Sequence, residues 1–170
     1  MSSASVQEHR AQAPLHVFAA VITISDTRTQ ENDTSGKAIV DSLKQAGHQV
    51  VAWEIVPDEP HIISETISRF RQLSKLDAIL LTGGTGVGSR DQTFETLSGL
   101  LTKTLPGFGE IFRMLSYQEI GAAAMLSRAI GGLIERTVVL AMPGSTAAVR
   151  LAMEKLILPE IGHLVREAQR

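Results

Sequence analysis

A glycine-rich segment after a short apolar stretch is the part of the sequence best suited to bind a phosphate. Ala78–Leu81 has the composition of a buried strand, and Gly83–Asp91 follows it with four glycines within six residues. Glycine lets the main chain reach positive φ and approach an anion closely, and N–H groups at a helix start attract phosphate oxygens. We therefore expect phosphate contacts from this loop, at Gly83, Gly84, Thr85, Gly86 and Ser89.

The charged pair that ends this loop adds two further functions. Arg90 offers a forked cationic contact to phosphate, and Asp91 offers an oxygen ligand to Mg²⁺. The loop matches neither of two known phosphate motifs. No Gly-Lys-Ser/Thr closes it as in a Walker loop, and Ser89 or Asp91 stands where a dinucleotide fingerprint has its third glycine. A tight turn that merely connects a strand to a helix is the simpler alternative.

The composition excludes several classes of protein. The chain has 170 residues, 44% of them hydrophobic and 20% charged, as in an ordinary globular domain. A formal net charge of −2 without a basic cluster argues against a nucleic-acid partner. No cysteine is present, and the five histidines are scattered without metal-ligand spacing, so we interpret them as surface or edge residues. No apolar run of about 20 residues and no signal peptide is found, which predicts a cytoplasmic protein without a membrane span.

The hydrophobic pattern alternates between strands and helices. Strands are predicted at Val17–Ile24, Gln49–Val56, Ala78–Leu81 and Thr137–Met142. Helices are predicted from a cap at Thr34 or Ser35 to Gly47, from Pro60, from about Thr93 to Leu101, over 145–157 with a break at Pro159, and from about Glu160 to Ala168. This order predicts an α/β fold with a mostly parallel sheet covered on both faces.

The remaining segments complete the expected organisation. Residues 1–14 lack an apolar period and are expected to form a disordered tail, which leaves residues 15–170 as one domain. Region 104–134 is the least regular, with a helix near Glu110–Leu115, and is expected to leave the sheet.

Polar residues follow each of the four predicted strands. They include Ser25 and Asp26, then Asp58 and Glu59, then the glycine loop, and finally Pro143, Gly144 and Ser145. Taken singly, Asp26 is a turn residue, and Asp58 or Glu59 is a helix cap. Because ligands bind beyond the carboxyl ends of parallel strands, however, we expect these groups to converge on one site.

Carboxylates beside phosphate-binding loops are typical of a magnesium-nucleotide site. No histidine lies near these motifs, so nucleotidyl or phosphoryl transfer is favoured over acyl hydrolysis. Ser127 and Arg128, which precede Ala129-Ile130-Gly131-Gly132, are either a second anion contact or a loop with a solvated arginine.

Seven short motifs, taken in order along the chain, resemble those of one known family. They are Thr23-Ile24-Ser25-Asp26-Thr27, Pro57-Asp58-Glu59, Thr82-Gly83-Gly84-Thr85-Gly86, Arg90-Asp91-Gln92-Thr93, Pro106-Gly107-Phe108-Gly109-Glu110, Leu126-Ser127-Arg128 and Met142-Pro143-Gly144-Ser145. Together they resemble the MoaB/MogA family of molybdenum cofactor biosynthesis proteins over roughly residues 16–168. The segments Phe108–Ser116, Gln118–Gly121 and Met142–Thr146 favour the MoaB branch.

The resemblance implies a fold, an assembly and an activity. The fold is a three-layer α/β domain, and the assembly is a trimer or a dimer of trimers. The ligand is molybdopterin, and active members use Mg²⁺ and ATP to adenylylate its terminal phosphate, with release of pyrophosphate. Other proteins of the pathway are further candidate partners. By similarity, Asp58 and Asp91 are the catalytic, metal-binding aspartates, and the binding loops hold Ser25, Asp26, Gly83–Gly86, Ser127, Arg128 and Pro143–Ser145.

Two features of the sequence bear on whether the chain is catalytic. The adenylyltransferase pattern often has Thr-Pro-Glu after the Arg-Asp pair, and here Thr93-Phe94-Glu95 stands there. Some members of the MoaB branch are inactive and have lost acidic positions, whereas this chain retains Asp26, Asp58 and Asp91. The retained aspartates favour a molybdopterin adenylyltransferase. The alternatives are a non-catalytic molybdopterin-binding or scaffold protein and a nucleotide-binding regulatory module.

Overall fold

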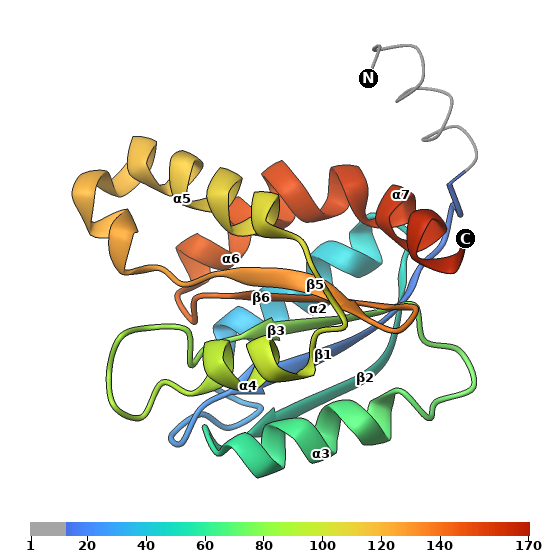
Figure 1. The fold of residues 1–170 in the computed structure, drawn as a ribbon, viewed down its shortest axis with the longest axis horizontal. Helices are drawn as coiled ribbons and strands as arrows, with labels where there is room; N and C mark the ends of the chain where they lie inside the picture. Colours follow the sequence, from blue (N-terminus) through green and yellow to red (C-terminus); the bar gives the residue numbers. More distant parts are fainter. Residues whose placement is uncertain (1–12) are drawn as a thin grey trace.

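A computed structural model describes residues 13–170 and shows a six-stranded sheet between two layers of helices (Figure 1). The strand order is β2-β1-β3-β6-β5-β4. Four strands run parallel: β1 (Phe18–Ile24), β2 (Gln49–Val56), β3 (Ala78–Thr82) and β6 (Thr137–Met142). The strands β5 (Ile130–Ile134) and β4 (Lys103–Thr104) form an antiparallel edge.

Alternate residues of the central strands enter two separate hydrophobic cores. On one face, Val21 and Leu80 join the core that is covered by α2 (Thr34–Gln45), α5 (Pro106–Ile120), α6 (Thr146–Ala152) and α7 (Leu158–Gln169). On the other face, Ile22 and Leu81 join the core covered by α3 (Pro60–Phe70) and α4 (Thr93–Leu100). Both faces of the central strands are therefore buried, which explains their continuous apolar runs. The predicted three-layer, mostly parallel α/β fold is confirmed.

Most predicted elements lie within a residue or two of the observed ones, and the cap of the first helix is a correction. The predicted cap was Thr34 or Ser35, but Asp33 caps α2, and its Oδ1 accepts a hydrogen bond from Gly36 N at 2.9 Å. Aspartate is as good an N-cap as serine, because its carboxylate meets the free N–H groups of the first turn. Gly47, at φ 83°, follows the end of this helix as predicted.

Region 104–134 is more regular than predicted. The helix α5 extends over Pro106–Ile120 and continues into the 3-10 helix η1 (Gly121–Leu126). The expectation that the whole region leaves the sheet is wrong for Ile130–Ile134, because β5 pairs with β6 in the antiparallel direction. Gly131 and Gly132 carry no apolar side chain to mark this strand in the sequence, so the pattern of alternating residues does not reveal it.

The expected break at Pro159 is also wrong. From Thr146 to Gln169 the backbone stays helical, through a π-helical turn η2 (Met153–Ile157) that joins α6 to α7. A proline inside a helix lacks an N–H and presses against the carbonyl four residues earlier. A π turn lies directly before Leu158 and Pro159, and in it the Leu158 N–H bonds to the Met153 carbonyl five residues earlier. The helix therefore passes Pro159 through a change of hydrogen-bond register and does not end there.

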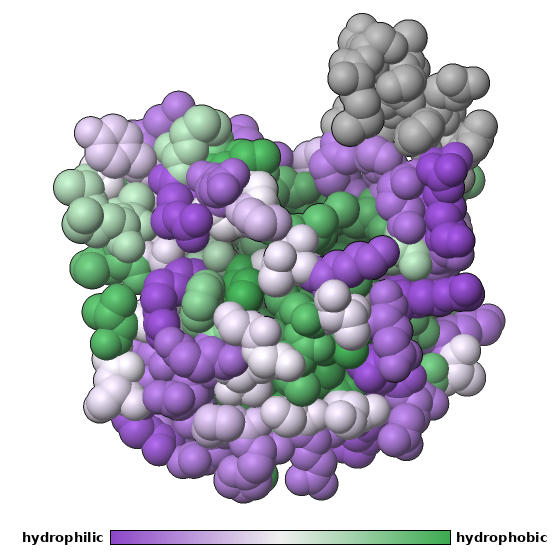
Figure 2. All heavy atoms as spheres, viewed as in Figure 1, coloured by the Kyte–Doolittle hydropathy of each residue, from purple (hydrophilic) through white to green (hydrophobic). Residues whose placement is uncertain are grey.

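The surface of the described residues shows one strongly apolar region. Ten large hydrophobic side chains are exposed, and six of them lie on α5 and η1: Ile111, Met114, Tyr117, Ile120, Met125 and Leu126. Figure 2 shows hydrophobic residues gathered at this end of the molecule and again in the middle of the viewed face. Among residues 13–170, no helix is long and apolar enough to cross a membrane.

The predicted tail at residues 1–14 falls mostly outside the described part of the chain, which begins at Ala13. Ala13 and Pro14 themselves lie against α7, where a Cβ built on Gly162 would be 3.0 Å from Pro14 O.

Candidate active site at the carboxyl ends of the parallel strands

The loops that follow β1, β2, β3 and β6 meet at one edge of the sheet. Asp58 N donates to Asp26 Oδ1 at 3.2 Å, which joins the loops after β2 and β1. Gly83 N donates to Met142 O at 3.1 Å, and Thr82 Oγ1 donates to Pro143 O at 3.1 Å, which joins the loops after β3 and β6. The convergence expected from the sequence is therefore present in the structure.

The glycine loop is held in a conformation that two of its glycines require. Gly83 has φ 105° and Gly84 has φ 62°, whereas Gly86 is not among the glycines with positive φ. A Cβ at Gly84 would overlap both Asp58 Oδ2 and Thr93 Oγ1. At Gly86 the Cβ would lie 2.8 Å from Asp91 Oδ2. The loop thus brings bare backbone against the carboxylates of Asp58 and Asp91, which no side chain-bearing residue would allow.

Asp58 is buried, with 6% of its surface exposed, and its carboxylate forms no ion pair within residues 13–170, although the charge of Arg90 lowers its pKa slightly. Its Oδ1 accepts a hydrogen bond from Gln92 N at 3.1 Å, and its Oδ2 accepts none from the described residues. Burial raises the pKa of Asp58, the Gln92 N–H partly offsets this, and the nearby charges of Asp91 and Asp26 raise the pKa further. A cation at this point would offset the cost of the buried charge.

Asp91 lines the same strand-end cavity as the glycine loop and lies against Gly86. Its Oδ2 accepts a hydrogen bond from Gly88 N at 2.8 Å, while its Oδ1 accepts none from residues 13–170. Asp58 and Asp91 each keep one such oxygen, and carboxylate oxygen is the ligand that Mg²⁺ prefers. No group of three or more His, Asp and Glu side chains that could hold a metal ion occurs in the described chain. A Mg²⁺ ion held by these two residues would have to take its other ligands from water and substrate phosphates.

Arg90 is committed to two carboxylates at the entrance of the site. Its guanidinium pairs with Asp26 Oδ2 at 3.0 Å and with Glu59 Oε1 at 2.8 Å. The Glu59 and Asp26 hydrogen bonds raise the pKa of Arg90 above its usual range, and the Arg90 hydrogen bond lowers the pKa of Asp26. Arg90 and Asp26 are exposed, so water and dissolved salt screen the attraction between the charges of this cluster.

Arg128 contacts the backbone carbonyl groups of the glycine loop. Its Nε donates to Gly86 O at 2.8 Å and to Thr85 O at 3.3 Å, and its Nη2 donates to Asp91 O at 3.3 Å. The guanidinium also pairs with Glu95, whose pKa it lowers, and lies 5.1 Å from the centre of the Phe94 ring. Carbonyl oxygens of the loop therefore face Arg128, and this arginine is not a solvated loop residue.

Two cavities open at this edge of the sheet. The first, of about 420 Å³, is lined by many of the predicted binding residues: Gly84, Thr85, Gly86, Asp91, Ser127, Pro143, Gly144 and Ser145. The second, of about 480 Å³, includes Ser25 and Asp26. Ser89 lines neither cavity, and its carbonyl accepts a hydrogen bond from Gln92 Nε2 at 3.0 Å.

Residues not selected from the sequence also shape the site. Thr93 is fully buried beside Gly84, and its Oγ1 is a buried hydroxyl without a hydrogen-bond partner in the described structure. Its place in the Arg90–Thr93 motif is a signal from which sequence analysis could have identified it.

Arg28 joins distant loops, because its Nη2 donates to Gly144 O at 3.2 Å and its Nη1 pairs with buried Asp33 at 3.1 Å. Nothing in the sequence spacing indicates that contact.

Comparisons with known proteins identify relatives of this chain. Residues 20–163 match a family model described as "Probable molybdopterin binding domain". The chain is 53% identical over 167 residues to molybdenum cofactor biosynthesis protein B of Bacillus cereus, covering 98% of this chain and 99% of the relative. It is 52% identical to the protein of the same name in Bacillus subtilis, with 98% of each chain covered.

Solved structures of similar proteins have the same fold. A crystal structure of molybdenum cofactor biosynthesis protein B matches with a TM-score of 0.90 at 53% identity, covering 94% of this chain and 99% of that one. The tungsten cofactor synthesizing protein MoaB from Pyrococcus furiosus matches with a TM-score of 0.82 at 38% identity, covering 93% and 100%. A MogA structure at 23% identity matches with a TM-score of 0.77, which supports the fold alone.

Proposed function

The chain belongs to the molybdopterin-binding domain family that includes molybdenum cofactor biosynthesis protein B, and from this premise we propose that it is a molybdopterin adenylyltransferase. In the proposed reaction, a phosphate oxygen of molybdopterin attacks the α-phosphorus of ATP. A new P–O bond forms, the bond to the β-phosphate oxygen breaks, and pyrophosphate leaves. The products are adenylyl-molybdopterin and pyrophosphate.

One observation carries the proposal beyond family membership: two aspartates and a glycine loop converge at the ends of the parallel strands. The buried Asp58 carboxylate lies directly against Gly84, and Asp91 lies against Gly86. Each has an oxygen without a hydrogen-bond donor from residues 13–170. A site that only stores an anionic pterin gains nothing from carboxylates beside the phosphate, because like charges repel. The arrangement is suited to phosphate chemistry that includes a cation.

The residues of the site then have distinct functions. Asp58 and Asp91 would hold Mg²⁺, which offsets negative charge on the phosphates when bound. The N–H groups of the glycine loop bind phosphate oxygens and orient them. Arg128 acts through this loop: by binding the carbonyls of Thr85 and Gly86 it fixes the peptide planes. Arg90 orders Asp26 and Glu59 at the entrance and adds positive charge near the incoming nucleotide.

The Pro143–Ser145 loop is proposed to contact the pterin. Ser145 caps α6, since its Oγ accepts a hydrogen bond from Ala148 N at 3.2 Å. Arg28 and Ser35 both donate to Gly144 O, Ser35 at 2.7 Å, and so hold this loop against the start of α2. Ser127 completes the same cavity from the start of the segment that leads into β5.

The test is a direct assay of the purified chain with molybdopterin, ATP and Mg²⁺. Formation of adenylyl-molybdopterin and pyrophosphate in equal amounts, lost on addition of EDTA, supports the proposal. Pterin binding with no turnover would identify a non-catalytic molybdopterin-binding or scaffold protein instead. Binding of nucleotide without pterin would identify a regulatory module.

We also propose that the chain assembles as a trimer or a dimer of trimers, as the family resemblance implies. The supporting observation is the exposed apolar face of α5 and η1, where Met114, Tyr117 and Met125 are each more than half exposed. A contiguous apolar surface of this kind is unusual in a monomer. The proposed occupant is a second copy of this chain.

A further inference from the structure

The start of α2 contains a buried carboxylate that takes no part in the proposed reaction. The side chain of Asp33 is fully buried, and three donors contact it. Gly36 N donates to its Oδ1 at 2.9 Å, Thr23 Oγ1 donates to its Oδ2 at 2.5 Å, and Arg28 Nη1 pairs with Oδ1 at 3.1 Å. A buried charge is costly unless it is paired and hydrogen-bonded, so these contacts fix both Asp33 and the guanidinium that neutralises it.

The same guanidinium reaches from the loop after β1 to the loop after β6. Arg28 Nη2 donates to Gly144 O at 3.2 Å, and Ser35 Oγ donates to the same oxygen at 2.7 Å. Both acceptor positions of this carbonyl are therefore used. Arg28 Nη1 also donates to Ser35 Oγ at 3.2 Å, which joins the two donors to each other. Asp33 thus anchors an arginine whose far end holds the Gly144 carbonyl.

Gly144 in turn lies against the first glycine of the phosphate-binding loop. A Cβ built on Gly144 would lie 3.3 Å from Gly83 Cα. Gly83 has φ 105°, and its N–H donates to Met142 O at 3.1 Å. Because these backbones are in close contact, a displacement of the Gly144 peptide would also displace Gly83. The loops that contain the two glycines both line the cavity of about 420 Å³ at the strand ends.

We propose that Arg28 is a positioning residue, which holds the Gly144 carbonyl and, through it, the two loops that bind molybdopterin. This inference rests on the proposed function, because it assigns molybdopterin to the cavity between these loops. The guanidinium acts on the ligand through the backbone, since its two terminal nitrogens are engaged by Asp33, Ser35 and Gly144. A planar fork suits this position, because one nitrogen pairs with Asp33 while the other reaches Gly144.

The first test replaces the fork with a single charged nitrogen. Arg28→Lys keeps a cation beside Asp33, so the buried carboxylate is not left unpaired, but it loses the fixed spacing that serves Asp33 and Gly144 together. We expect the Kd for molybdopterin to rise at least tenfold in equilibrium binding, while the number of sites per chain stays that of the parent. A merely structural defect would lower the number of competent sites and leave the Kd of the remaining sites unchanged.

A matched control is available away from the strand-end site. The side chain of Arg71 is 25% exposed, against 29% for Arg28, and it pairs with Glu135 at 2.6 Å in the turn before β6. Arg71→Lys therefore makes the same exchange in an ion pair of similar burial. We expect it to bind molybdopterin with the parent's Kd.

A second measurement needs no ligand. In the segment Met142–Val149, Ala148 N donates to Ser145 Oγ at 3.2 Å and Val149 N donates to Ser145 O at 3.0 Å. Hydrogen exchange of the free protein, followed by mass spectrometry, reports how firmly this segment is held. We expect at least threefold faster exchange there in Arg28→Lys than in the parent or in Arg71→Lys, with unchanged rates in α4.

The inference is overturned if Arg28→Lys binds molybdopterin with the parent's Kd, or if exchange over Met142–Val149 is the same in both proteins. A parent that binds no molybdopterin would overturn the proposed function instead. In that case the exchange rates would still support or refute the hold of Arg28 on the Gly144 loop.

Discussion

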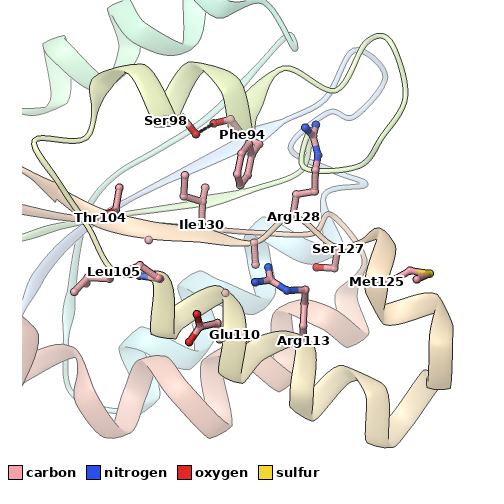
Figure 3. Close-up of a pocket in the computed structure, with 14 residues that line it drawn as sticks. Phe94, Ser98, Thr104, Leu105, Glu110, Arg113, Met125, Ser127, Arg128 and Ile130 are labelled. Carbon is pink, nitrogen blue, oxygen red and sulfur yellow. Dashed lines mark hydrogen bonds between the residues drawn. The ribbon is translucent and has the colours of Figure 1, made fainter.

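The strand-end site differs from the cavity between α4 and α5, which Phe94, Arg113 and Ile130 help to line (Figure 3), in how many ion pairs and hydrogen bonds its charged side chains form. At the strand ends, charged side chains form a dense network in which Arg90, Asp26 and Glu59 are mutually paired. Beside β5, the walls are largely apolar, and Arg113 stands without a partner among residues 13–170. A dense network fixes the geometry before a ligand arrives, as phosphate chemistry requires. Among residues 13–170, no such network surrounds Arg113.

The largest effect is expected when a negative charge is removed from the strand-end site. Asp91→Asn and Asp58→Asn keep the side-chain shape but lose the charge that holds a cation. Loss of one such electrostatic contact commonly costs about 10²–10³ in rate, or about 3–4 kcal/mol. We expect each variant to abolish measurable adenylylation while molybdopterin affinity stays within a few-fold. Parent-like turnover by both variants would show that the catalytic assignment is wrong.

The next largest effect is expected at the apolar face of α5. Met114→Glu places a charge on a side chain that is 55% exposed in the single chain and, in the proposed assembly, covered by another copy. Burial of an unpaired charge is strongly unfavourable, so the variant should dissociate the oligomer. Light scattering at micromolar concentration measures this. Leu73→Glu, at an exposed position away from α5, is the control and should keep the parent's mass. A monomeric parent would refute the assembly.

Substitutions at two glycines are expected to have smaller effects and to separate a loss of ligand affinity from a loss of folding stability. Gly86→Val is expected to weaken molybdopterin binding at least tenfold, because its Cβ would lie 2.8 Å from Asp91 Oδ2 and its side chain would enter the cavity. Gly109→Ala instead disturbs the contact between α5 and the Ala129 carbonyl just before β5, so it should lower the free energy of unfolding and leave molybdopterin affinity unchanged. Urea denaturation measures the free energy of unfolding, and equilibrium binding measures the affinity for molybdopterin. Equal affinity in Gly86→Val and the parent would contradict the hypothesis that the glycine loop binds the phosphate.

The smallest effect is a pH dependence in which neighbouring aspartates act in opposite directions. Burial raises the pKa of Asp58, so the ionised side chain costs stability at neutral pH, and this cost disappears as pH falls through the raised pKa toward 3.8. The Arg90 hydrogen bond lowers the pKa of Asp26, so Asp26 contributes stability above pH 3.8 that is lost as pH falls through its lowered pKa.

In metal-free buffer at pH 7, Asp58→Asn should therefore raise the Tm slightly and Asp26→Asn should lower it. Both differences should shrink in acid, as measured by thermal unfolding from pH 7 to pH 3. Added Mg²⁺ with ATP should stabilise the parent more than Asp58→Asn. A lower Tm for Asp58→Asn than for the parent at pH 7 would contradict the interpretation of its burial.

The sequence by itself determined the four parallel strands and the site at their carboxyl ends. Apolar runs mark β1, β3 and β6, and a largely apolar stretch with Gln49 and Glu54 marks β2. Parallel strands then bring Asp26, Asp58 and the glycine loop to one edge of the sheet. Motifs such as Arg90–Thr93 then indicated the family, which the comparisons confirm.

Tertiary structure alone decided the features that depend on contacts between distant segments. The strand β5 contains two glycines and is defined by its partner β6, and the helix continues through Pro159 because a π turn precedes it. Likewise, Arg128 donates to the carbonyls of a loop more than forty residues away, whereas the Arg113 guanidinium has no hydrogen-bond or ion-pair partner within residues 13–170. Both arginines look alike in the sequence, because local pattern records the residue type but not the atoms that folding brings to it.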